Sequence, residues 1–338
     1  MKKYVWGVQD TQFFFSLTPE IILDAIDELG FKTTGRCLPL NSIENRVYEV
    51  EVQRLESEVS TASDNFIVTK FYRPGRWTKD QILDEHEFLY DLLEADVQVI
   101  PPLKIDGVSL FELEKHQIYY CVYSKRGGRN PDEMNKEQLE IMGRSLARIH
   151  NVGAQKKSLH RIELNPESYG QANIEYLMST DFIPLDIREH YLNLVNEVVT
   201  ASEELFEKVE VQRIHGDFHK GNIILRGNES YFVDFDDMVN GPVVQDVWPI
   251  CSGDEKESLL DRDIFLKAYD SIRHFPNRQL GLISPLRALR LIHFSAWIAK
   301  RWDDPSFRHT FSYFDSPSYW YGQLSDIQNL HHRINNKL

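Results

Sequence analysis

Three side chains with carboxylate or amide oxygens surround a short apolar run in the second half of the chain. Asp217 and Asn222 lie in the run His-Gly-Asp-Phe-His-Lys-Gly-Asn at 215–222, and Asp234 follows twelve residues after Asn222. Transfer of a phosphoryl group from ATP needs one carboxylate to orient a hydroxyl nucleophile, and an Asn and an Asp to hold magnesium against the phosphates. The residue types and their spacing therefore predict kinase chemistry.

Each of these residues has a predicted role. Asp217 accepts or orients the proton of the nucleophile, because an ionised carboxylate is an acceptor at neutral pH. Asn222 and Asp234 offer oxygens to Mg²⁺, which prefers one or two carboxylates completed by waters and phosphate oxygens. Asp236 lies two residues beyond Asp234, on the same face if the strand continues, and is predicted as a second metal contact.

The apolar runs at 223–225 and 231–233 are predicted to pair as a hairpin closed through Gly227-Asn228. This pairing brings the ends that carry Asn222 and Asp234 together. Two other interpretations stay open. The segment can be a surface hairpin whose polar residues only form turns. His215, Asp217 and His219 can also chelate zinc, iron or manganese in a metallophosphoesterase-like hydrolase, although such sites need further His and Asp clusters that we do not find.

Lys70 lies in the middle of a β-branched and aromatic run at 66–72 that is predicted to form a strand. A lone Lys in such a strand is often an edge or snorkelling residue. The helix that follows favours another role. Its carboxylate Glu85 falls on the apolar stripe, whereas Glu87 points to solvent. An unpaired buried charge costs about 3–5 kcal/mol, so Glu85 needs a partner, and we predict Lys70. In kinases such a pair positions the Lys on the ATP phosphates.

That helix is predicted to begin at a capping box formed by Thr78 and Gln81. Its apolar stripe is predicted from residues at helical spacing, which are Ile82, Leu89, Leu92 and Leu93. No Gly-x-Gly-x-x-Gly loop precedes Lys70. In its place stands the segment 40–48, where Ser42 or the local backbone amides are candidates to cap the phosphates.

The order of predicted elements gives an α+β protein with a bilobal, protein-kinase-like fold. Strands are predicted at 47–52, 66–72, 97–102 and 118–123, and helices dominate after a break at Gly127-Gly128 and Asn130-Pro131. They include a helix at 136–150 and a buried one that starts at Ser284-Pro285. The predicted domains are a small strand-rich ATP-binding lobe, 1–124, and a larger helical catalytic and substrate lobe, 125–338.

Composition narrows the classes of partner. With 38 Lys and Arg against 52 Asp and Glu, the net charge is −14, which argues against broad binding to nucleic acid and to anionic membrane surfaces. The three cysteines, Cys37, Cys121 and Cys251, form no disulfide or zinc pattern. The first residues lack the apolar run of a signal peptide, and no stretch approaches the about 20 apolar residues of a membrane helix. We expect a cytoplasmic protein.

The His-Gly-Asp-x-His-x-x-Asn run, with Val-Asp-Phe-Asp-Asp at 233–237, resembles the aminoglycoside phosphotransferase and choline kinase superfamily, whose fold is related to eukaryotic protein kinases. Blocks at 39–48, 70–77, 240–248 and 287–291 are similar to one bacterial branch of it. The resemblance implies a cytoplasmic, monomeric, ATP- and magnesium-dependent protein serine/threonine kinase that acts in stress protection. It also implies Asp217 as proton acceptor, magnesium at Asn222 and Asp234, and Ser42 at the ATP site.

The sequence therefore predicts transfer of the γ-phosphate of ATP to a Ser or Thr hydroxyl of a protein, including its own. The alternative is a small-molecule kinase acting on an amino alcohol, sugar or aminoglycoside hydroxyl. A third hypothesis, a nucleotide-sensing scaffold without turnover, would be expected to have lost one of Lys70, Asp217, Asn222 or Asp234, and all four are present.

Overall fold

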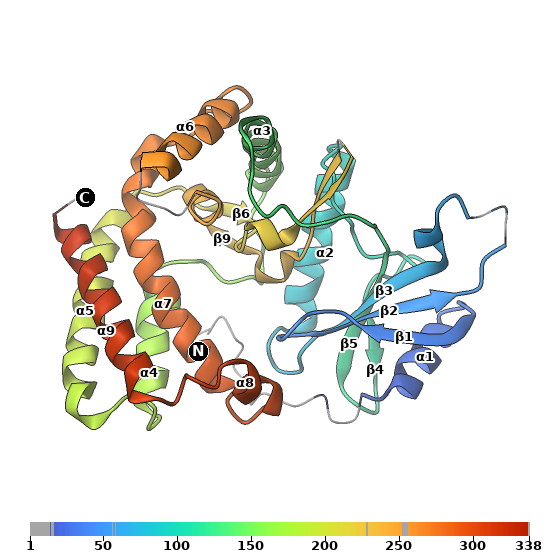
Figure 1. Cartoon of the computed structure of the whole chain (residues 1–338), viewed down its shortest axis with the longest axis horizontal. Helices are drawn as coiled ribbons and strands as arrows, with labels where there is room; N and C mark the ends of the chain where they lie inside the picture. Colours follow the sequence, from blue (N-terminus) through green and yellow to red (C-terminus); the bar gives the residue numbers. More distant parts are fainter. Residues whose placement is uncertain are drawn as a thin grey trace. The chain divides into compact units, whose positions relative to one another are not determined.

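The computed structural model describes residues 14, 17–55, 57, 59–227, 229–251 and 256–336. Of these, the residues up to Pro131 together with Gly221–Asp236 form one compact unit, the sheet unit. Asp132–Lys220 and the residues from Asp237 onwards form the second, the helical unit (Figure 1). The predicted lobes 1–124 and 125–338 differ from these units in where residues 125–131 and 221–236 belong. The assignment of functions to two lobes stays a prediction.

An antiparallel sheet of five strands forms the frame of the sheet unit, in the order β1-β2-β3-β5-β4. Lys70 lies opposite Val47 of β2 and Cys121 of β5, so it belongs to a central strand. The predicted strands at 47–52, 66–72 and 118–123 are confirmed. The strands are β1 (Thr33–Pro39), β2 (Arg46–Val52), β3 (Phe66–Phe71), β4 (Phe111–Leu113) and β5 (Ile118–Ser124).

One face of this sheet is covered by α1 (Pro19–Glu28), which the sequence reading did not predict. The helix starts at the N-cap Thr18, whose side chain accepts a hydrogen bond from the backbone N–H of Ile21. Its buried residues Ile22 and Ile26 pack into the same apolar cluster as strand residues such as Phe71. The helix has only ten residues, but Thr18 as N-cap and Pro19 at the first position are start signals from which it could have been predicted.

The helix α2 (Lys79–Glu94) follows β3, as predicted. The capping box is present, because the Thr78 side chain accepts from the Gln81 backbone and the Gln81 side chain accepts from the Thr78 backbone. Glu85 is buried and Glu87 is exposed, as the helical spacing predicts. The prediction for Leu93 is wrong, since 49% of it is exposed, so the stripe ends one residue earlier, at Leu92.

A hairpin of β7 (Ile223–Arg226) and β8 (Glu229–Phe232) belongs to the sheet unit although it comes late in the chain. The predicted pairing is confirmed, with Ile223 opposite Phe232. Asn130 anchors the hairpin, because its side-chain amide donates to the carbonyl of Gly221 (2.7 Å) and to that of Ile223 (2.8 Å). Of the predicted turn, Gly227 has a positive φ of 60°, and Asn228 lies outside the described residues.

Helices make up most of the helical unit, and a two-stranded ribbon accompanies them. In Figure 1, α5, α7 and α9 lie side by side, and α3 packs against α6. The elements are α3 (Lys136–Gly153), α4 (Ala172–Met178), α5 (Leu185–Phe206), β6 (Gln212–Ile214), β9 (Val239–Gly241), α6 (Lys256–Asp270), α7 (Ile283–Lys300), α8 (Pro305–Thr310) and α9 (Pro317–Asn335). The α+β class with a strand-rich region followed by a mostly helical one is confirmed.

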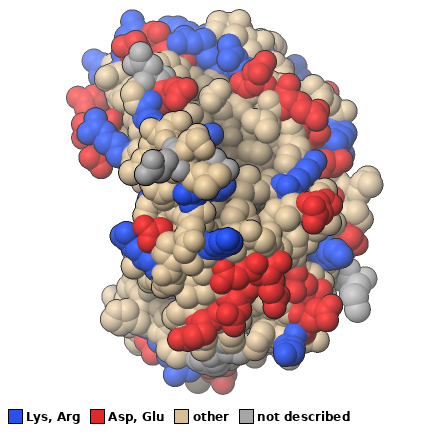
Figure 2. Space-filling model, turned by 90° about the vertical axis from the view of Figure 1, so that its right-hand side faces the viewer, with Lys and Arg blue, Asp and Glu red and all other residues tan. Residues whose placement is uncertain are grey.

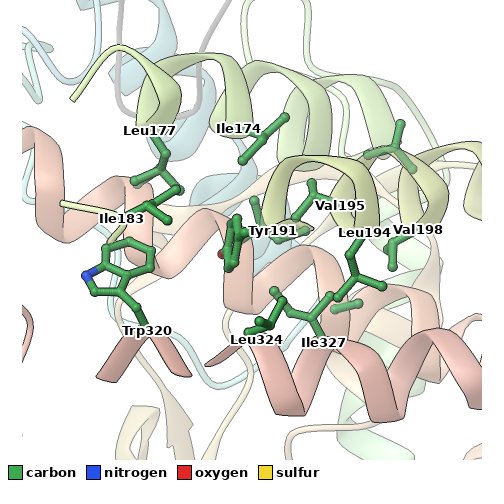
Figure 3. Close-up of a cluster of buried hydrophobic side chains, with 14 of the residues drawn as sticks. Ile174, Leu177, Ile183, Tyr191, Leu194, Val195, Val198, Trp320, Leu324 and Ile327 are labelled. Atoms are coloured by element: carbon green, nitrogen blue, oxygen red, sulfur yellow. The ribbon is translucent and has the colours of Figure 1, made fainter. Parts of the chain in front are cut away.

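The core of the helical unit lies between α4, α5, α7 and α9 (Figure 3). Tyr191 of α5 and Trp320 of α9 are fully buried and meet edge to face, with ring centroids 5.9 Å apart. The buried face of α7 contributes Ala288, Ile292 and Ala296 to this core. Since α7 is held on several sides, it is a rigid support for side chains on its remaining face.

Two further predictions about elements are wrong. The run 97–102 forms no strand but makes isolated bridges, from Val99 to Phe232 and from Pro102 to Tyr123, because prolines at 101 and 102 lack the N–H that a strand ladder needs. The helix predicted to start with Ser284 as N-cap begins at Ile283 after Leu282, so Ser284 and Pro285 lie within its first turn.

Candidate active site

Lys70 is buried in the sheet unit and faces three carboxylates. Its Nζ lies 3.4 Å from Oε1 of Glu85, 3.0 Å from Oδ1 of Asp236 and 3.6 Å from Oδ1 of Asp234. The predicted strand-to-helix pair of Lys70 and Glu85 is therefore present. The interpretation of Lys70 as a snorkelling edge residue is wrong, because Lys70 sits in a central strand and its ammonium is inside.

The charges of this group explain how a lysine is tolerated there. Burial alone would lower the pKa of Lys70, but the carboxylates of Asp236, Glu85 and Asp234 outweigh it and raise that pKa above its ordinary value. Lys70 is therefore a cation at neutral pH. Three carboxylates against one ammonium leave an excess of negative charge, part of which Arg76 neutralises by pairing with Asp236. The remaining charge favours a bound cation.

A chain of polar side chains also reaches Glu85 within the sheet unit. The Tyr72 hydroxyl lies 3.5 Å from Oε2 of Glu85 and 3.0 Å from Nε2 of His86, and His86 Nδ1 lies 2.9 Å from the Ser109 hydroxyl. His86, which lies near the apolar stripe of α2, is therefore a buried hydrogen-bonding residue beside Glu85. This network limits the orientations that the Glu85 carboxylate can take.

Asn222 and Asp234 are held at the same end of the β7–β8 hairpin. The backbone N–H of Val233 donates to the carbonyl of Asn222 at 3.0 Å, which brings the two chain segments together as predicted. Asp234 has a positive φ of 60°, a conformation that Asp tolerates better than most residues. The Asp234 side chain is 58% exposed, so it is the most accessible of the carboxylates that face Lys70. Its oxygens are open to a metal ion.

Asp236 is arranged differently from the prediction. The strand ends at Phe232, and Phe235–Asp237 form a turn of 3-10 helix, so Asp236 does not follow Asp234 along one strand face. Its carboxylate is buried, with Oδ1 toward Lys70 and Oδ2 accepting from Arg76. These two cations make Asp236 an internal counter-ion, and a role as second metal ligand stays a prediction.

The loop that replaces a glycine-rich loop is held by two buried arginines. Ser42 lies half-buried in this loop, between β1 and β2. The Arg73 guanidinium donates to the carbonyls of Glu44 (2.9 Å) and Ile43 (3.2 Å), and Arg76 pairs with the Glu44 carboxylate at 3.6 Å. Because Arg76 also pairs with Asp236, the loop is connected to the segment that carries Asp234. A role of Ser42 at the phosphates stays a prediction.

Asp217 belongs to the helical unit, in the loop after β6. The glycine before it is required, because Gly216 has a positive φ of 85° and a Cβ there would collide with the carbonyl of Asp237. Asp246 holds the backbone of this loop in place. Its two oxygens accept from the backbone N–H groups of His215 and Gly216, both at 2.8 Å, and the Gln245 amide donates to the Gly216 carbonyl at 3.0 Å.

Both oxygens of Asp217 have cationic or polar neighbours. Nη2 of Arg290, from α7, donates to Oδ1 at 2.7 Å, and Nε2 of His219 lies 3.2 Å from Oδ2. Burial alone would raise the pKa of Asp217, but the hydrogen bond with His219 and the charge of Arg290 outweigh it and hold that pKa below its ordinary value. Asp217 is therefore ionised at neutral pH, as an acceptor must be.

The structure brings Lys70, Glu85, Asp234 and Asp236 together in the sheet unit, with Asn222 beside Asp234 through the hairpin. Asp217 lies in the helical unit, and one site formed by all of them stays a prediction. The sequence reading missed Arg76, Asp246 and Arg290. Each lies in one of the blocks that resemble the family, at 70–77, 240–248 and 287–291, but no spacing rule connects residues so far apart in the chain.

The metal-hydrolase alternative finds no support in the described part of the chain. No group of three or more His, Cys, Asp or Glu side chains is placed there to hold a metal ion. His215 is buried, accepts a hydrogen bond from the backbone N–H of Asp217 and packs its ring against Phe218. A site completed by phosphate oxygens needs fewer protein ligands, and the prediction of Asn222 and Asp234 as magnesium ligands requires only such a pair.

Sequence comparison assigns the class. The profile of the phosphotransferase enzyme family matches residues 37–280, and the chain belongs to this family. Stress response kinase A of Escherichia coli is 36% identical over 313 residues, which is 92% of each chain. The serine/threonine protein kinase RdoA of Salmonella typhimurium is 34% identical over 321 residues, 94% of each chain. The chain is a homologue of these kinases.

Solved structures agree on the fold. A microcompartment-associated aminopropanol kinase has a TM-score of 0.70 at 16% identity, covering 95% of this chain and 98% of that one. An amicoumacin kinase in complex with AMP-PNP, Ca²⁺ and amicoumacin has a TM-score of 0.68 at 18% identity, covering 94% and 93%. At this identity the likeness concerns the fold alone.

Proposed function

We propose that this chain is an ATP- and magnesium-dependent protein kinase that transfers the γ-phosphate of ATP to Ser or Thr hydroxyls of proteins, including its own. The observation that carries the proposal is the buried Lys70, paired with Glu85 on one side and facing Asp234 within 3.6 Å on the other. Kinases orient a triphosphate with a cation of this kind, placed between a carboxylate of a helix and a carboxylate of the loop that binds the metal ion.

Lys70 contacts the phosphates of ATP and neutralises their charge, and Glu85 holds the ammonium in place for that contact. Ser42 and the backbone of its loop cap the phosphates, in the absence of a glycine-rich loop. The buried contacts of Arg73 and Arg76 support this role, because they hold the loop without the flexibility that glycines would give it.

Asn222 and Asp234 are the residues that hold Mg²⁺. Their oxygen donors are the type that this hard cation prefers, and the exposed Asp234 carboxylate leaves room for waters and phosphate oxygens. The ion, when bound, neutralises charge on the β- and γ-phosphates. Asp236 then either stays paired with Lys70 and Arg76 or contributes a second metal contact. The variant Asp236→Asn distinguishes the two roles.

Asp217 receives the hydrogen bond of the acceptor hydroxyl. The lowered pKa of Asp217 supports an orienting role more than that of a strong base. That is sufficient where the transition state is loose and the hydroxyl proton leaves late. A protein acceptor is favoured by the relative that is a serine/threonine protein kinase, RdoA of Salmonella typhimurium. Arg290 also neutralises Asp217, so the pair attracts the ammonium of an amino alcohol or aminoglycoside less than a lone carboxylate would.

The test is transfer of label from ATP in the presence of Mg²⁺, with protein alone and with a panel of amino alcohols, sugars and aminoglycosides. Label on Ser or Thr of the protein supports the proposal. Release of ADP only when a metabolite is added supports the small-molecule alternative instead. Asp217→Ala is expected to abolish transfer while ATP affinity changes little, and undiminished transfer in that variant removes Asp217 from its role.

A further inference from the structure

The Arg290 guanidinium and the Asp217 carboxylate form an ion pair that the kinase reaction as described does not require. The two residues are 73 positions apart, and Nη2 of Arg290 donates to Oδ1 of Asp217 at 2.7 Å. On the other side of the carboxylate, His219 Nε2 lies 3.2 Å from Oδ2. The carboxylate is thus contacted at both oxygens, so its rotation about the side-chain bond is restricted.

Arg290 is held on a rigid element. It lies on α7 directly after the fully buried Leu289, and the buried face of this helix belongs to the main core of the helical unit. The guanidinium also lies 5.8 Å from the centroid of the Trp248 ring. The position of the guanidinium is therefore defined by packing.

The simplest explanation would be an ordinary surface ion pair, but the carboxylate of the Arg290–Asp217 pair is much less exposed than in such a pair. The Asp217 side chain is only 20% exposed, whereas in the surface pair of Arg308 and Asp303 the carboxylate is 83% exposed at nearly the same distance, 2.9 Å. Exposed pairs of the second kind contribute little to stability. The partner of Arg290, in contrast, is the carboxylate assigned to the acceptor hydroxyl.

We propose that Arg290 is a positioning residue for phosphoryl transfer, which fixes the orientation of the Asp217 carboxylate toward the acceptor hydroxyl. This inference rests on the proposed function. The acceptor O–H donates to Asp217 in the complex, and Arg290 and His219 occupy the other sides of the carboxylate. Asp217 then needs no reorientation when the acceptor arrives, which reduces the entropic part of the barrier.

The test compares Arg290→Met, Arg290→Lys and the control Arg308→Met, which removes the surface pair. Arg290→Met is expected to lower kcat about 100-fold while the KM for ATP stays within a factor of about two, because misplacing a reacting group acts on the chemical step. Arg290→Lys keeps a cation that can reach Asp217 and is expected to recover most of the loss. The control keeps the kcat of the unsubstituted protein.

A double substitution decides whether Arg290 acts through Asp217. In the background of Asp217→Asn, the further change Arg290→Met is expected to lower the residual kcat by less than a factor of about three. An equal loss in both backgrounds, or a rise in the KM for ATP without loss of kcat, overturns the proposal.

The same variants give a readout that does not need activity. If the unsubstituted protein transfers no phosphate to any acceptor, the proposed function fails. The pairing itself is still measured by the midpoints of urea unfolding of the single and double variants at neutral pH. Non-additive midpoints support the coupling of Arg290 with Asp217, and additive ones overturn the inference independently of the reaction.

Discussion

At the scale of single residues, the chemistry depends on charges that are buried with their partners. Lys70 shows this most clearly, because it is surrounded by Glu85, Asp234 and Asp236 and remains a cation. Asp217 shows the opposite case, a carboxylate kept ionised by Arg290 and His219. In each place the protein supplies the counter-charges before any ligand is present, so little rearrangement is needed when one binds.

Replacing Lys70 is expected to cost more stability than replacing Glu85. Lys70→Met leaves three carboxylates facing one another, and breaking a buried ion pair costs about 3–5 kcal/mol. Glu85→Gln removes one of the three carboxylates and leaves Lys70 paired with Asp236, so a smaller loss in the free energy of unfolding is expected. Urea unfolding at pH 7 measures both, and an equal or larger loss for Glu85→Gln contradicts the assignment of Asp236 as counter-ion.

The contribution of the Arg290–Asp217 pair to stability is expected to depend on pH. The folded pKa of Asp217 lies below the ordinary value of about 3.9, so the pair stabilises the fold above that value and its contribution is lost as pH falls toward the folded pKa. Arg290 is partly exposed, so the contribution at pH 7 is expected to be about 1 kcal/mol or less.

The measurement is the difference in free energy of unfolding between the unsubstituted protein and Arg290→Met, at pH 7 and at pH 3. The difference is expected to be largest at pH 7 and to shrink at pH 3. Arg308→Met serves as the control, with a small difference at both values. A loss for Arg290→Met that is the same at both pH values would show that packing, and not the charge of Asp217, is what Arg290 supplies.

At the scale of elements, local sequence patterns predict the structure formed by residues that are close in sequence. The capping box at Thr78 and Gln81 and the placement of Glu85 on the buried side of α2 follow from helical spacing. The pairing of Asn222 with the Asp234 segment follows from the length of the hairpin. Where the pattern is interrupted, as in the run 97–102 with its two prolines, the prediction is wrong. The ten-residue α1 was not predicted, although Thr18 and Pro19 mark its start.

Contacts between distant segments are not encoded in such patterns. Arg290 follows the apolar residues of α7 as an ordinary surface arginine would, and only the packing of α7 against the rest of the helical unit brings it to Asp217. Asp246 likewise lies in a short 3-10 helix, with no spacing that points to the backbone of His215 and Gly216. The contacts of Arg290 and Asp246 are therefore the part that sequence patterns could not predict.

The Asp246 contacts predict a specific effect of an isosteric change. Asp246→Asn keeps one acceptor oxygen but places an amide group against a buried backbone N–H, either that of His215 or that of Gly216. An unsatisfied buried group costs about 1–3 kcal/mol, and displacement of the loop is expected to lower kcat as well. Asp270→Asn, at a half-exposed carboxylate that accepts from the backbone of Phe275, is the control. Unchanged stability and kcat in Asp246→Asn would contradict the role of Asp246.

At the scale of the whole molecule, three of the candidate residues lie close in sequence to the points where the chain passes from one unit to the other. The chain leaves the helical unit after Lys220 and returns at Asp237, and the hairpin between these points belongs to the sheet unit. Asp217 precedes the first passage, and Asn222 and Asp234 flank the hairpin within the inserted segment Gly221–Asp236. The spacing from which the kinase chemistry was predicted is therefore the length of one hairpin.

The net charge of −14 is also a property of the whole molecule. On the face drawn in Figure 2, Asp and Glu side chains gather into a contiguous patch, while Lys and Arg are scattered. The absence of nucleic-acid and anionic-lipid partners stays a prediction, which the sign of this charge favours. No helix in the described part of the chain is long and apolar enough to cross a membrane.

Binding of a nucleotide with its metal is expected to stabilise the folded protein by mass action. At a ligand concentration 100 times the dissociation constant, the gain is about 2.7 kcal/mol for a site present only in the folded state. The thermal midpoint is therefore expected to rise with ATP and Mg²⁺ together, and to rise less with ATP and a chelator. A midpoint that does not respond to ATP under either condition would contradict a nucleotide site in the protein.

Variants of two neighbouring residues, Asp234 and Asp236, then distinguish a metal ligand from a counter-ion. Asp234→Asn changes an exposed side chain, so the midpoint without ligand is expected to stay near that of the unsubstituted protein while the part of the gain that depends on Mg²⁺ is lost. Asp236→Asn removes the buried partner of Lys70 and Arg76, so the midpoint without ligand is expected to fall, with the Mg²⁺-dependent gain retained. Loss of that gain in both variants, without a fall in the ligand-free midpoint of Asp236→Asn, would favour Asp236 as a second magnesium ligand over Asp236 as a counter-ion.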